Sequence, residues 1–424
     1  MLALQFIREK RDLIIEAQKK RNFNAEKTID EIIKLDSLKR SNQIELESNL
    51  AKANLIAKEI GILYKAGEEK KAVHLKTKSS DLKISSKTIQ DKLNDLEKKI
   101  LDLRTQIPNI PHETVPNGVS EKDNEEIFKS DNLVKLPLNA LPHWELAEKY
   151  DIIDFDLGSK ISGSGFPVYK NKGARLQRGL INFFLDKNIS AGYTEFQVPH
   201  LVNAESGFGT GNLPDKEGQM YHAHEDDLYL IPTAEVPLTN LYRDVLLNEN
   251  DLPICITGYT PCFRREAGSY GAQVRGLNRL HQFDKVEIVR LETPEKAITA
   301  LNGMVEHIKT ILSALELPYR ILRLCGGDLG FTSALTYDFE IYSAAQKRWL
   351  EISSVSMFND FQSERLKLRY KTKQGNKQSV FTLNGSALAL PRVLAGLLEN
   401  FQTEKGITIP KALIPYTGFD IIKL

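Results

Sequence analysis

Near the start of the chain, mostly apolar residues recur with the spacing of an α-helix over many turns. Residues 28–104 contain no proline and are rich in lysine, glutamate and leucine, which is the composition of long helices. Steps of three and four residues join the members of a first stripe, which are Ile32, Leu35, Lys39, Asn42, Leu46, Asn49, Ala53, Ile56, Ile60 and Leu63. The same steps join those of a second stripe, Leu82, Ser86, Ile89, Leu93, Leu96, Ile100 and Leu103. We therefore predict two long helices, each with one stripe to bury.

The segment GILYKAGEEKKA, residues 61–72, separates the two predicted helices. Its Gly61 and Gly67 suit a reversal of direction, so we expect the helices to pack as an antiparallel hairpin. On pattern alone, a dimerisation coiled coil and a projecting binding arm are equally good interpretations. A set of lysines at the tip and on the returning helix favours an arm that meets a phosphate backbone: Lys65, Lys70, Lys71, Lys76, Lys78, Lys83, Lys87 and Lys92.

The proline-rich segment IPNIPHETVPNG, residues 107–118, ends the helical pattern and predicts a linker. We expect one domain over residues 1–110, with the hairpin at 28–104, and a second over 111–424. Short runs typical of strands follow the linker, namely TEFQVPHLV, DDLYLI, KVEIVRL, TYDFEIY, RWLEIS and SVFTLNG. Helical patterns lie between and after them, in RLQRGLINFFLDKN, EKAITALNGMVEHIKTILSAL and LALPRVLAGLLENFQ.

These runs do not alternate as regular βαβ units, and the chain contains neither G-x-G-x-x-G nor the P-loop pattern. The fold class that fits is α+β: a helical hairpin followed by an antiparallel sheet with helices packed on it.

Composition narrows the class of protein without naming a function. The 424 residues are 41% hydrophobic and 27% charged, which suits about two globular domains. The net charge is only +1, so a polyanion would have to meet a local basic patch. Three cysteines without a CxxC pair argue against a disulfide framework and against a cysteine-built zinc site. The charged start MLALQFIREKRD does not resemble a signal peptide, and we expect a cytoplasmic protein.

The stretch FRREAGSYG, residues 263–271, places charged residues where a strand runs into a loop. If the backbone is extended, Arg264 and Glu266 share one face and Arg265 takes the other. The next predicted strand contains KVEIV, and Phe283 lies just before this run. Phe283 and Glu287 are four residues apart, so their side chains would point to the same face of that strand. A guanidinium, carboxylates and an aromatic ring on one sheet face are typical of a nucleotide site, since arginine binds phosphate and a ring stacks on a base.

Two later stretches carry related chemistry. LEISS, residues 350–354, offers Glu351 and Ser354 as oxygen ligands for Mg²⁺. They lie three residues apart, so the strand must end or bend there for both to reach one ion. LNGSALALPR, residues 383–392, predicts a glycine turn into a helix that bears Arg392.

Together these stretches resemble a known family. FRREAGS with RGLNRLHQFDKVE resembles motif 2 of the class II aminoacyl-tRNA synthetases, in the form used by the bacterial seryl-tRNA synthetases. IPTAEVPLTNLY, EISSVSMFNDFQSERLKLRY and TLNGSALALPR resemble that family's serine-site, metal-site and motif 3 segments, and TEFQVPHLV resembles motif 1, with its interface proline at Pro199. The resemblance runs the whole length, and the predicted hairpin resembles the family's tRNA-binding arm.

The resemblance implies an ATP-dependent ligase that forms seryl-adenylate and pyrophosphate from L-serine and ATP, and then transfers serine to the terminal adenosine of serine tRNA. It implies a homodimer, leaves selenocysteine tRNA open as a second substrate, and implies Mg²⁺ with ATP. Arg264, Arg392 and Glu351 would be catalytic. The residues implied to bind ATP are Arg264, Arg265, Glu266, Phe283, Glu351, Ile352, Ser353, Ser354 and Arg392. Of these, Glu351 and Ser354 would also bind the metal ion. The residues implied to bind serine are Thr233, Ala234, Glu235, Arg264, Glu287, Asn384 and Ser386.

Within these motifs, Arg264 would hold the α-phosphate and the serine carboxylate, and Arg392 the γ-phosphate. Glu266 would accept from the adenine amino group, and Phe283 would stack on the adenine. The chain departs from the family's common EISSCSNFEDFQ at Val355, Met357 and Asn359, and it has Pro391 where glycine is frequent before the motif 3 arginine. Pro391 lacks an amide donor, which leaves the start of that helix open.

Two rival interpretations remain at this stage. An amino-acid:carrier-protein ligase on the same catalytic fold would not need the arm at 28–104. An inactive RNA-binding relative would not need Arg264, Glu287, Glu351 and Arg392 to be intact.

Overall fold

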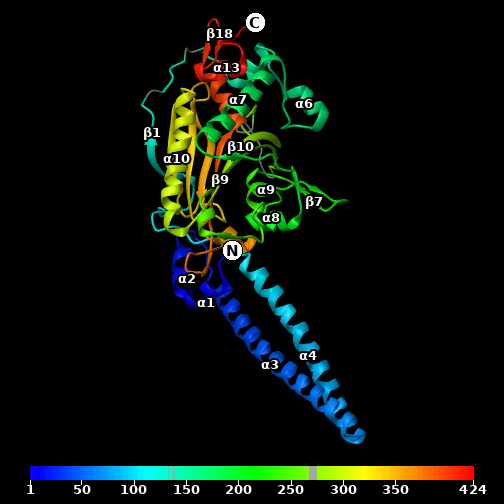
Figure 1. The fold of residues 1–424 in the computed structure, drawn as a ribbon. Helices are drawn as coiled ribbons and strands as arrows, with labels where there is room; N and C mark the ends of the chain where they lie inside the picture. Colours follow the sequence, from blue (N-terminus) through cyan, green and yellow to red (C-terminus); the bar gives the residue numbers. More distant parts are fainter. Residues whose placement is uncertain (132, 137–138, 267–274) are drawn as a thin grey trace. The chain divides into compact units, whose positions relative to one another are not determined.

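The two long helices predicted from the stripes are present in the computed structural model as α3 (Glu26–Lys65) and α4 (Glu69–Arg104). They run antiparallel and reverse at residues 66–68, where Gly67 takes a φ of 76°, a conformation that favours glycine. Gly61, which we had expected to take part in the reversal, lies inside α3 because nothing in its surroundings interrupts the helix. Figure 1 shows the hairpin in blue to cyan.

The seam of the hairpin follows the predicted stripes. Every stripe position is buried or half-buried, and the buried members are Ile32, Leu46, Ser86, Ile89, Leu93, Leu96 and Ile100. Polar stripe positions find partners in or beside the seam: Lys39 Nζ lies 2.7 Å from a carboxylate oxygen of Glu97, and the Asn49 amide donates to Ser85 Oγ at 3.2 Å. The predicted helical hairpin is therefore confirmed.

The structure describes residues 1–131, 133–136, 139–266 and 275–424, and these divide into two compact units. The helical unit comprises Leu2–Lys19 and Phe23–Pro108, and holds α1 (Leu4–Glu9) and α2 (Arg11–Lys19) besides the hairpin. The larger unit comprises Met1, Lys20–Asn22 and Asn109–Leu424. Residues 267–274, the loop of the FRREAGSYG motif, lie outside the described residues.

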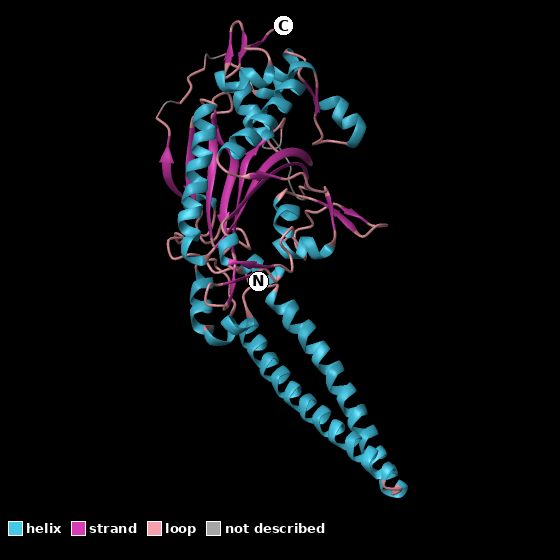
Figure 2. Ribbon diagram, viewed as in Figure 1, coloured by secondary structure: helices cyan, strands magenta, loops and turns pink. Residues whose placement is uncertain are grey.

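The larger unit is built on an eight-stranded sheet in the order β1-β11-β12-β13-β16-β10-β9-β4. Its strands are β1 (Glu125–Lys129), β4 (Thr194–Glu195), β9 (Ile254–Phe263), β10 (Gln282–Glu292), β11 (Tyr319–Arg323), β12 (Leu335–Ser343), β13 (Arg348–Met357) and β16 (Phe381–Ala389). All neighbours pair antiparallel except β4, which runs parallel to β9 at one edge. The predicted antiparallel-sheet domain is confirmed, and Figure 2 shows the sheet in magenta.

Further helices and short strands surround this sheet. The helices are α5 (His143–Lys149), α6 (Phe155–Ser162), α7 (Asn171–Ser190), α8 (Ala204–Thr210), α9 (Glu235–Asn240), α10 (Ala297–Ala314), α11 (Phe361–Leu366), α12 (Leu390–Asn400) and α13 (Ile414–Thr417). The short strands are β2 (Ile153–Asp154), β3 (Val168–Tyr169), β5 (Leu201–Val202), β6 (His222–Ala223), β7 (Leu228–Leu230), β8 (Leu246–Asn248), β14 (Arg369–Lys371), β15 (Lys377–Ser379), β17 (Gln402–Thr403), β18 (Gly406–Thr408) and β19 (Ile421–Ile422).

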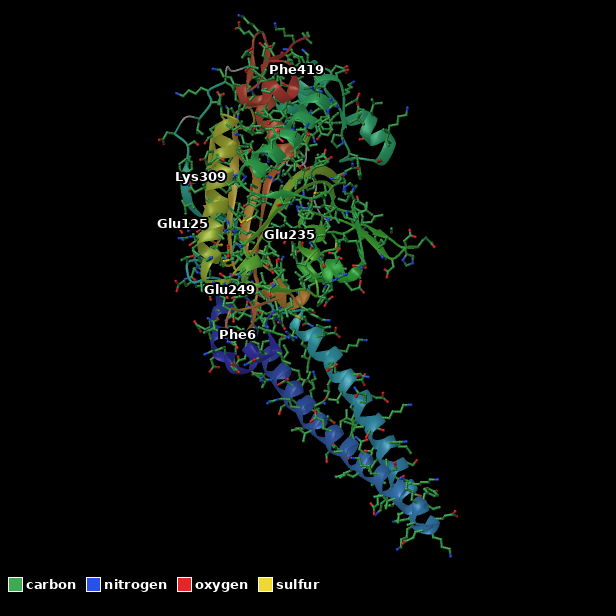
Figure 3. All side chains as sticks on the ribbon, in the orientation of Figure 1. Phe6, Glu125, Glu235, Glu249, Lys309 and Phe419 are labelled. Atoms are coloured by element: carbon green, nitrogen blue, oxygen red, sulfur yellow. The ribbon has the colours of Figure 1, made fainter. Side chains whose placement is uncertain are left out.

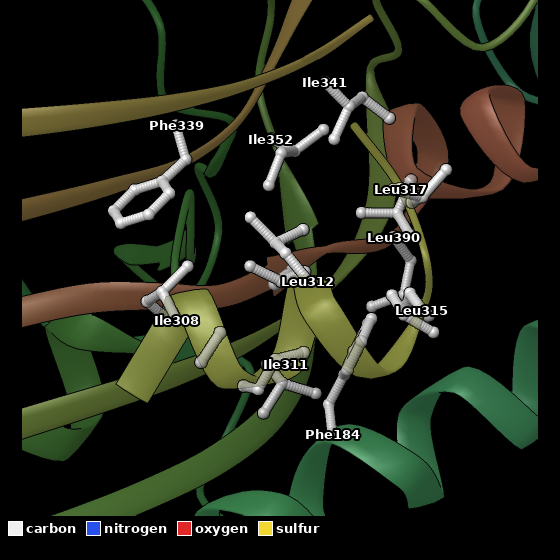
Figure 4. Packing of buried hydrophobic residues seen from close by; sticks show 14 of the residues in the cluster. Phe184, Ile308, Ile311, Leu312, Leu315, Leu317, Phe339, Ile341, Ile352 and Leu390 are labelled. Atoms are coloured by element: carbon white, nitrogen blue, oxygen red, sulfur yellow. The ribbon is translucent and has the colours of Figure 1, made fainter. Parts of the chain in front are cut away.

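The two faces of the large sheet have different roles. On β10 and β12, Val286, Ile288, Phe339 and Ile341 point into one hydrophobic core together with residues of α7, α10 and α12. Figure 4 shows Ile311 and Leu312 of α10 with Ile352 and other members of this core. Because side chains alternate along a strand, the intervening residues point to the opposite face. Helices α7, α10 and α12 thus cover one face, and the charged residues of the motifs lie on the other.

Two predicted boundaries are wrong. The run TEFQVPHLV is not one strand: it splits into β4 and β5, with Pro199 between them, because proline cannot donate to a ladder. The run LALPRVLAGLLENFQ is strand up to Ala389, and α12 begins at Leu390. Pro391 therefore stands in the first turn of α12, where a missing amide hydrogen costs nothing. The glycine turn predicted in LNGSALALPR is also wrong, because β16 continues through Gly385, which pairs in the ladder.

Among the described residues, no helix combines the length and the apolar character that a bilayer crossing requires. All three cysteines are free thiols.

Candidate active site

A cavity of about 270 Å³ opens on the sheet face that the three long helices leave uncovered. Its lining comes from the end of β9, from β10, β13 and β16, and from the start of α12. Residues predicted to bind ATP are prominent in it: Arg264, Glu266, Phe283, Glu351, Ile352, Ser353 and Arg392. The antiparallel order of the sheet brings these residues together from a span of more than a hundred positions in the sequence.

The FRRE segment reaches this cavity at the end of a strand. β9 stops at Phe263, so residues 264–266 are not strand, and Glu266 has a φ of 48°. Arg264 and Glu266 nevertheless both line the cavity. Arg265 is not among its lining residues, and its amide donates to the Gln219 carbonyl at 2.8 Å. The separation of the two arginines was predicted correctly, but a change of backbone conformation accompanies it and simple strand alternation does not explain it.

Contacts with neighbouring residues hold the side chains of Arg264 and Glu266. Nε of Arg264 donates to the Pro232 carbonyl at 3.3 Å, and its guanidinium carbon lies 5.3 Å from the centre of the Phe283 ring, within cation–π range. Glu266 forms an ion pair with Arg279. An arginine that stacks on an aromatic ring keeps its other donors available to an anion.

Strand β10 contributes alternate residues to the same face. Phe283 and Lys285 line the cavity, and Glu287 follows them with the same parity. Glu287 is completely buried and accepts from Asn384 Nδ2 at 2.8 Å, from Lys285 Nζ at 2.8 Å and from Ser386 Oγ at 3.5 Å. Asn384 and Ser386 come from the neighbouring strand β16, in which Ser386 pairs directly with Glu287. The residues predicted from the TLNGSALALPR motif therefore surround this carboxylate.

A second carboxylate lies close by on α9. Glu235, labelled in Figure 3, accepts from Gln362 Nε2 at 2.7 Å, and its amide donates to Thr233 Oγ1 at 3.2 Å. Burial and the neighbouring Glu287 carboxylate raise the pKa of Glu235 to about 7. Thr233 and Ala234, also predicted for serine, are buried just before the helix begins. Two carboxylates beside hydroxyl and amide groups make a small polar site suited to an ammonium group.

A β-bulge brings Glu351 and Ser354 to one face. The register between β12 and β13 shifts at Ile352, since Ser353 pairs with Phe339 while Glu351 pairs with Glu340. Before the shift Leu350 and Ile352 belong to the core, and after it Val355 and Met357 do. The residues between them, Glu351 and Ser354, are therefore turned to the opposite face. The predicted bend in this strand is present.

Asp338 stands beside this pair of oxygen donors. It is the partner of Ser354 across the β12–β13 ladder. Burial and the charge of Glu351 raise the pKa of Asp338 well above its usual value. The Glu351 and Asp338 carboxylates repel one another, and two such carboxylates beside the Ser354 hydroxyl fit a hard divalent cation, which would relieve that repulsion.

Arg392 lies at the start of α12, and hydrogen bonds to two backbone carbonyls hold its guanidinium. Its Nε donates to the Asn278 carbonyl at 2.9 Å, and its Nη1 donates to the Glu351 carbonyl at 2.8 Å and lies 3.5 Å from a carboxylate oxygen of Glu351. The Arg392 side chain is about one-third exposed and lines the cavity, so it can meet a ligand there. Ser353 Oγ donates to the Ser386 carbonyl at 2.5 Å, which joins β13 to β16.

Sequence reasoning missed several residues that line or shape the cavity. Lys285 had a usable signal, because it shares its parity with Phe283 and Glu287. Asn278 and Arg279 follow residues 267–274 in the sequence and line the cavity as well. Gln362, which holds Glu235, is 127 positions away from it in the sequence and gave no local signal.

Comparisons with known proteins agree with this geometry. The model for the seryl-tRNA synthetase N-terminal domain matches residues 1–111, and the model for the class II tRNA synthetase core domain (G, H, P, S and T) matches residues 219–401. A serine–tRNA ligase of Salinibacter ruber is 45% identical over 99% of this chain and 98% of its own length. One of Thermotoga neapolitana is 45% identical over the full length of both chains.

Solved structures agree as well. The crystal structure of seryl-tRNA synthetase from Pyrococcus horikoshii complexed with ATP superposes with a TM-score of 0.91 at 34% identity, covering 100% of this chain and 99% of that one. A cytoplasmic serine–tRNA ligase of Naegleria fowleri in complex with AMP gives a TM-score of 0.86 at 25% identity, over 100% and 99% of the two chains. This chain belongs to the seryl-tRNA synthetase family, and its activity is that of a class II serine–tRNA ligase.

Proposed function

We propose that this ligase works in two steps at the cavity on the sheet face. L-serine and ATP react to seryl-adenylate and pyrophosphate, and serine then passes to the 3′-terminal adenosine of serine tRNA. The observation that carries the proposal is the arrangement around one cavity of Arg264, Phe283, Glu351 and Arg392, with the Glu287 carboxylate next to it.

The first step needs alignment and charge neutralisation more than a nucleophilic side chain. The serine carboxylate itself attacks the α-phosphorus, and pyrophosphate leaves from the opposite side. Arg264 would bind the α-phosphate and the serine carboxylate, so that the two reacting groups share one cation. Phe283 would stack on the adenine. Arg392 would hold the γ-phosphate in the leaving group.

Glu266 would accept a hydrogen bond from the adenine amino group, and residues 352–353 would offer their backbone to the nucleotide. Arg265, whose amide is bonded to Gln219 and whose side chain does not line the cavity, has at most an outer role in binding ATP.

Glu351 and Ser354 would hold the magnesium ion that accompanies ATP. Their oxygens fit such a cation because the bulge turns both of them to the cavity face. When bound, the ion would neutralise phosphate charge.

Serine would occupy the polar site around Glu287. Its ammonium group would meet Glu287 and Glu235, and its hydroxyl would lie near Ser386, Asn384 and Thr233. Alanine would leave these buried polar groups without a partner, which costs far more than the loss of contact area. Threonine carries an additional methyl group that the closely bonded site does not accommodate.

The helical hairpin would bind the tRNA. Lysines gather along its tip and returning helix, and the family model for the seryl-tRNA synthetase N-terminal domain covers this part of the chain. Contacts to phosphates supply most of the affinity of such a surface and depend strongly on salt. We accordingly assign residues 1–110 to tRNA binding and residues 111–424 to catalysis. A transcript of selenocysteine tRNA tests whether this second RNA is charged too.

We further propose a cytoplasmic homodimer. The exposed Pro199 lies between β4 and β5, and β4 is an edge strand of the large sheet. Light scattering of the purified protein tests the dimer.

Serine-dependent exchange of pyrophosphate into ATP tests the first step, and charging of a serine tRNA transcript tests the second. Exchange with serine and charging of the transcript are both expected. Exchange without charging, with transfer to a carrier protein in its place, would favour the carrier-protein ligase. Neither reaction in a folded protein would mean an inactive relative.

A further inference from the structure

A ring of hydrogen-bonded polar groups, some buried and some half-buried, lies next to the cavity, outside the residues assigned to ATP or serine. His143 at the start of α5 and Glu399 near the end of α12 are both completely buried. Glu399 Oε1 lies 2.8 Å from His143 Nδ1 and accepts from the His143 amide at 3.0 Å and from Gln346 Nε2 at 2.8 Å. Ser343 Oγ donates to the other carboxylate oxygen. Such a network is costly to bury unless all its members are bonded.

The hydrogen bonds of this network determine which nitrogen of the His143 imidazole carries the proton. The Leu277 amide donates to His143 Nε2 at 2.8 Å, so this nitrogen must carry a lone pair. The proton of a neutral imidazole is then on Nδ1, where it is donated to Glu399. Although burial alone would raise it, hydrogen bonds from His143 and Ser343 hold the pKa of Glu399 below its usual value. The carboxylate therefore remains charged and keeps the imidazole in this one tautomer.

The other side of the ring leads to Arg392. Gln346 Oε1 accepts from Asn278 Nδ2 at 3.1 Å, and the Asn278 carbonyl accepts from Nε of Arg392 at 2.9 Å. Leu277 and Asn278 are adjacent in the sequence, so the ring holds this piece of backbone by an amide hydrogen and by a side chain. It fixes the carbonyl that faces Arg392.

The backbone at Gly276 packs closely against the His143 imidazole. A Cβ added at Gly276 would lie 2.3 Å from His143 Nε2, and Gly276 has a φ of 67°, which glycine adopts without strain. The backbone can approach the imidazole only because residue 276 has no side chain.

We propose that His143 and Gln346 are positioning residues for ATP: through the Leu277–Asn278 backbone they orient the Arg392 guanidinium toward the triphosphate. The inference rests on the proposed role of Arg392 in binding ATP. His143 and Gln346 themselves are absent from the lining of the cavity, so their effect on ATP passes through the residues they hold.

Two substitutions of His143 separate the halves of its role. His143→Asn places an amide donor near the position of Nδ1, so it keeps the bond to Glu399 and loses the acceptor for the Leu277 amide. His143→Gln places a carbonyl oxygen near the position of Nε2, so it keeps that acceptor and loses the donor to Glu399. Gln346→Met removes the link to Asn278 while it preserves size. His307→Asn serves as a matched control, because the His307 imidazole bonds to Asn188 at 2.7 Å on the helix-covered side of the sheet.

In pyrophosphate exchange, His143→Asn and Gln346→Met are expected to raise the KM for ATP about tenfold, as the loss of an oriented cation would, and to leave the KM for serine within about twofold. His143→Gln is expected to stay close to the wild type in both constants. His307→Asn is expected to lower the melting temperature and leave both constants unchanged. Hydrogen exchange of the segment 275–281, followed by mass spectrometry, should accelerate in His143→Asn and not in His143→Gln.

Equal effects of His143→Asn and His143→Gln, or activity losses that follow the melting temperature with an unchanged KM for ATP, would overturn the proposal. Unchanged exchange of residues 275–281 in His143→Asn would do the same. The hydrogen-exchange measurement requires no activity, so it tests the anchoring of this segment by itself. Absence of pyrophosphate exchange in the wild type would count against the proposed function instead.

Discussion

Substitution of Glu287 by glutamine tests the assignment of this buried carboxylate to serine. Glutamine preserves the shape of the side chain but replaces one carboxylate oxygen with an amide group that donates. In the structure the carboxylate accepts from Asn384, Lys285 and Ser386, all of which donate. An amide at this position can satisfy only some of these donors, and it no longer attracts the ammonium group of serine.

The size of the effect follows from burial. A hydrogen bond to a charged group is worth about 1.5 to 3 kcal/mol, and each 1.4 kcal/mol is tenfold in affinity, so the KM for serine should rise about tenfold to a hundredfold. Lys285 is itself only 7% exposed and would lose its carboxylate partner. Because breaking a buried ion pair is destabilising, the melting temperature should fall as well.

Pyrophosphate exchange with serine and ATP varied in turn measures the two KM values, and circular dichroism confirms folding. Glu292→Gln is the matched control, because Glu292 is also buried on β10 and is paired with Arg290 at 2.9 Å, away from the cavity. It should lower the melting temperature without raising the KM for serine. If Glu287→Gln changed only the KM for ATP, or if both variants raised the KM for serine equally, the reasoning about this pocket would be wrong.

Three further predictions follow from the same geometry. Arg264→Ala should slow adenylate formation by about 3 kcal/mol or more, whereas Arg265→Ala should have a smaller effect; equal losses in pyrophosphate exchange would contradict the difference between the two side chains. Because the raised pKa of Glu235 means that the folded state holds its proton more tightly than the unfolded state does, the contribution of Glu235 to stability should fall as the pH rises from the usual carboxylate range through about 7. The melting temperature of Glu235→Gln relative to the wild type should therefore increase over this window, and a constant difference would contradict the assignment. Replacing residues 28–104 with a glycine-serine bridge should preserve serine-dependent exchange and abolish charging of tRNA, and charge reversal at Lys70, Lys71, Lys76 and Lys78 should give a milder, salt-sensitive defect; unchanged kcat/KM for tRNA charging in the truncated protein would refute the role of the arm.

Local patterns predicted the fold well where one period dominates. The hairpin stripes predicted the seam residue by residue, because a long two-helix arm has only one surface to bury. The alternation along β10 placed Phe283 and Glu287 on one face, opposite Val286 and Ile288 of the core. The requirement that Glu351 and Ser354 share a face predicted a bend, which the structure forms as a bulge.

The rest depends on distant parts of the chain. Strand β9 ends at Phe263, and two residues later the amide of Arg265 bonds to Gln219, a partner that no local pattern identifies. The hydrogen bond from Gln362 to Glu235 and the ring from His143 to Asn278 join positions more than a hundred residues apart. Single-sequence patterns carry information about neighbours along the chain and not about such pairs.

The uneven seam of the hairpin also determines where the arm first opens. In α3, all of whose residues the structure describes, the buried positions end at Leu46, which packs with Ile89 and Leu93 of α4. Toward Gly67 the seam is only half-buried, apart from Ala72. Amides there should exchange with solvent through local unfolding long before those near Leu46, because few apolar contacts hold them closed. A ligand that binds the tip must order these residues, so part of its binding free energy is lost, and in return the tip can follow more than one RNA contour.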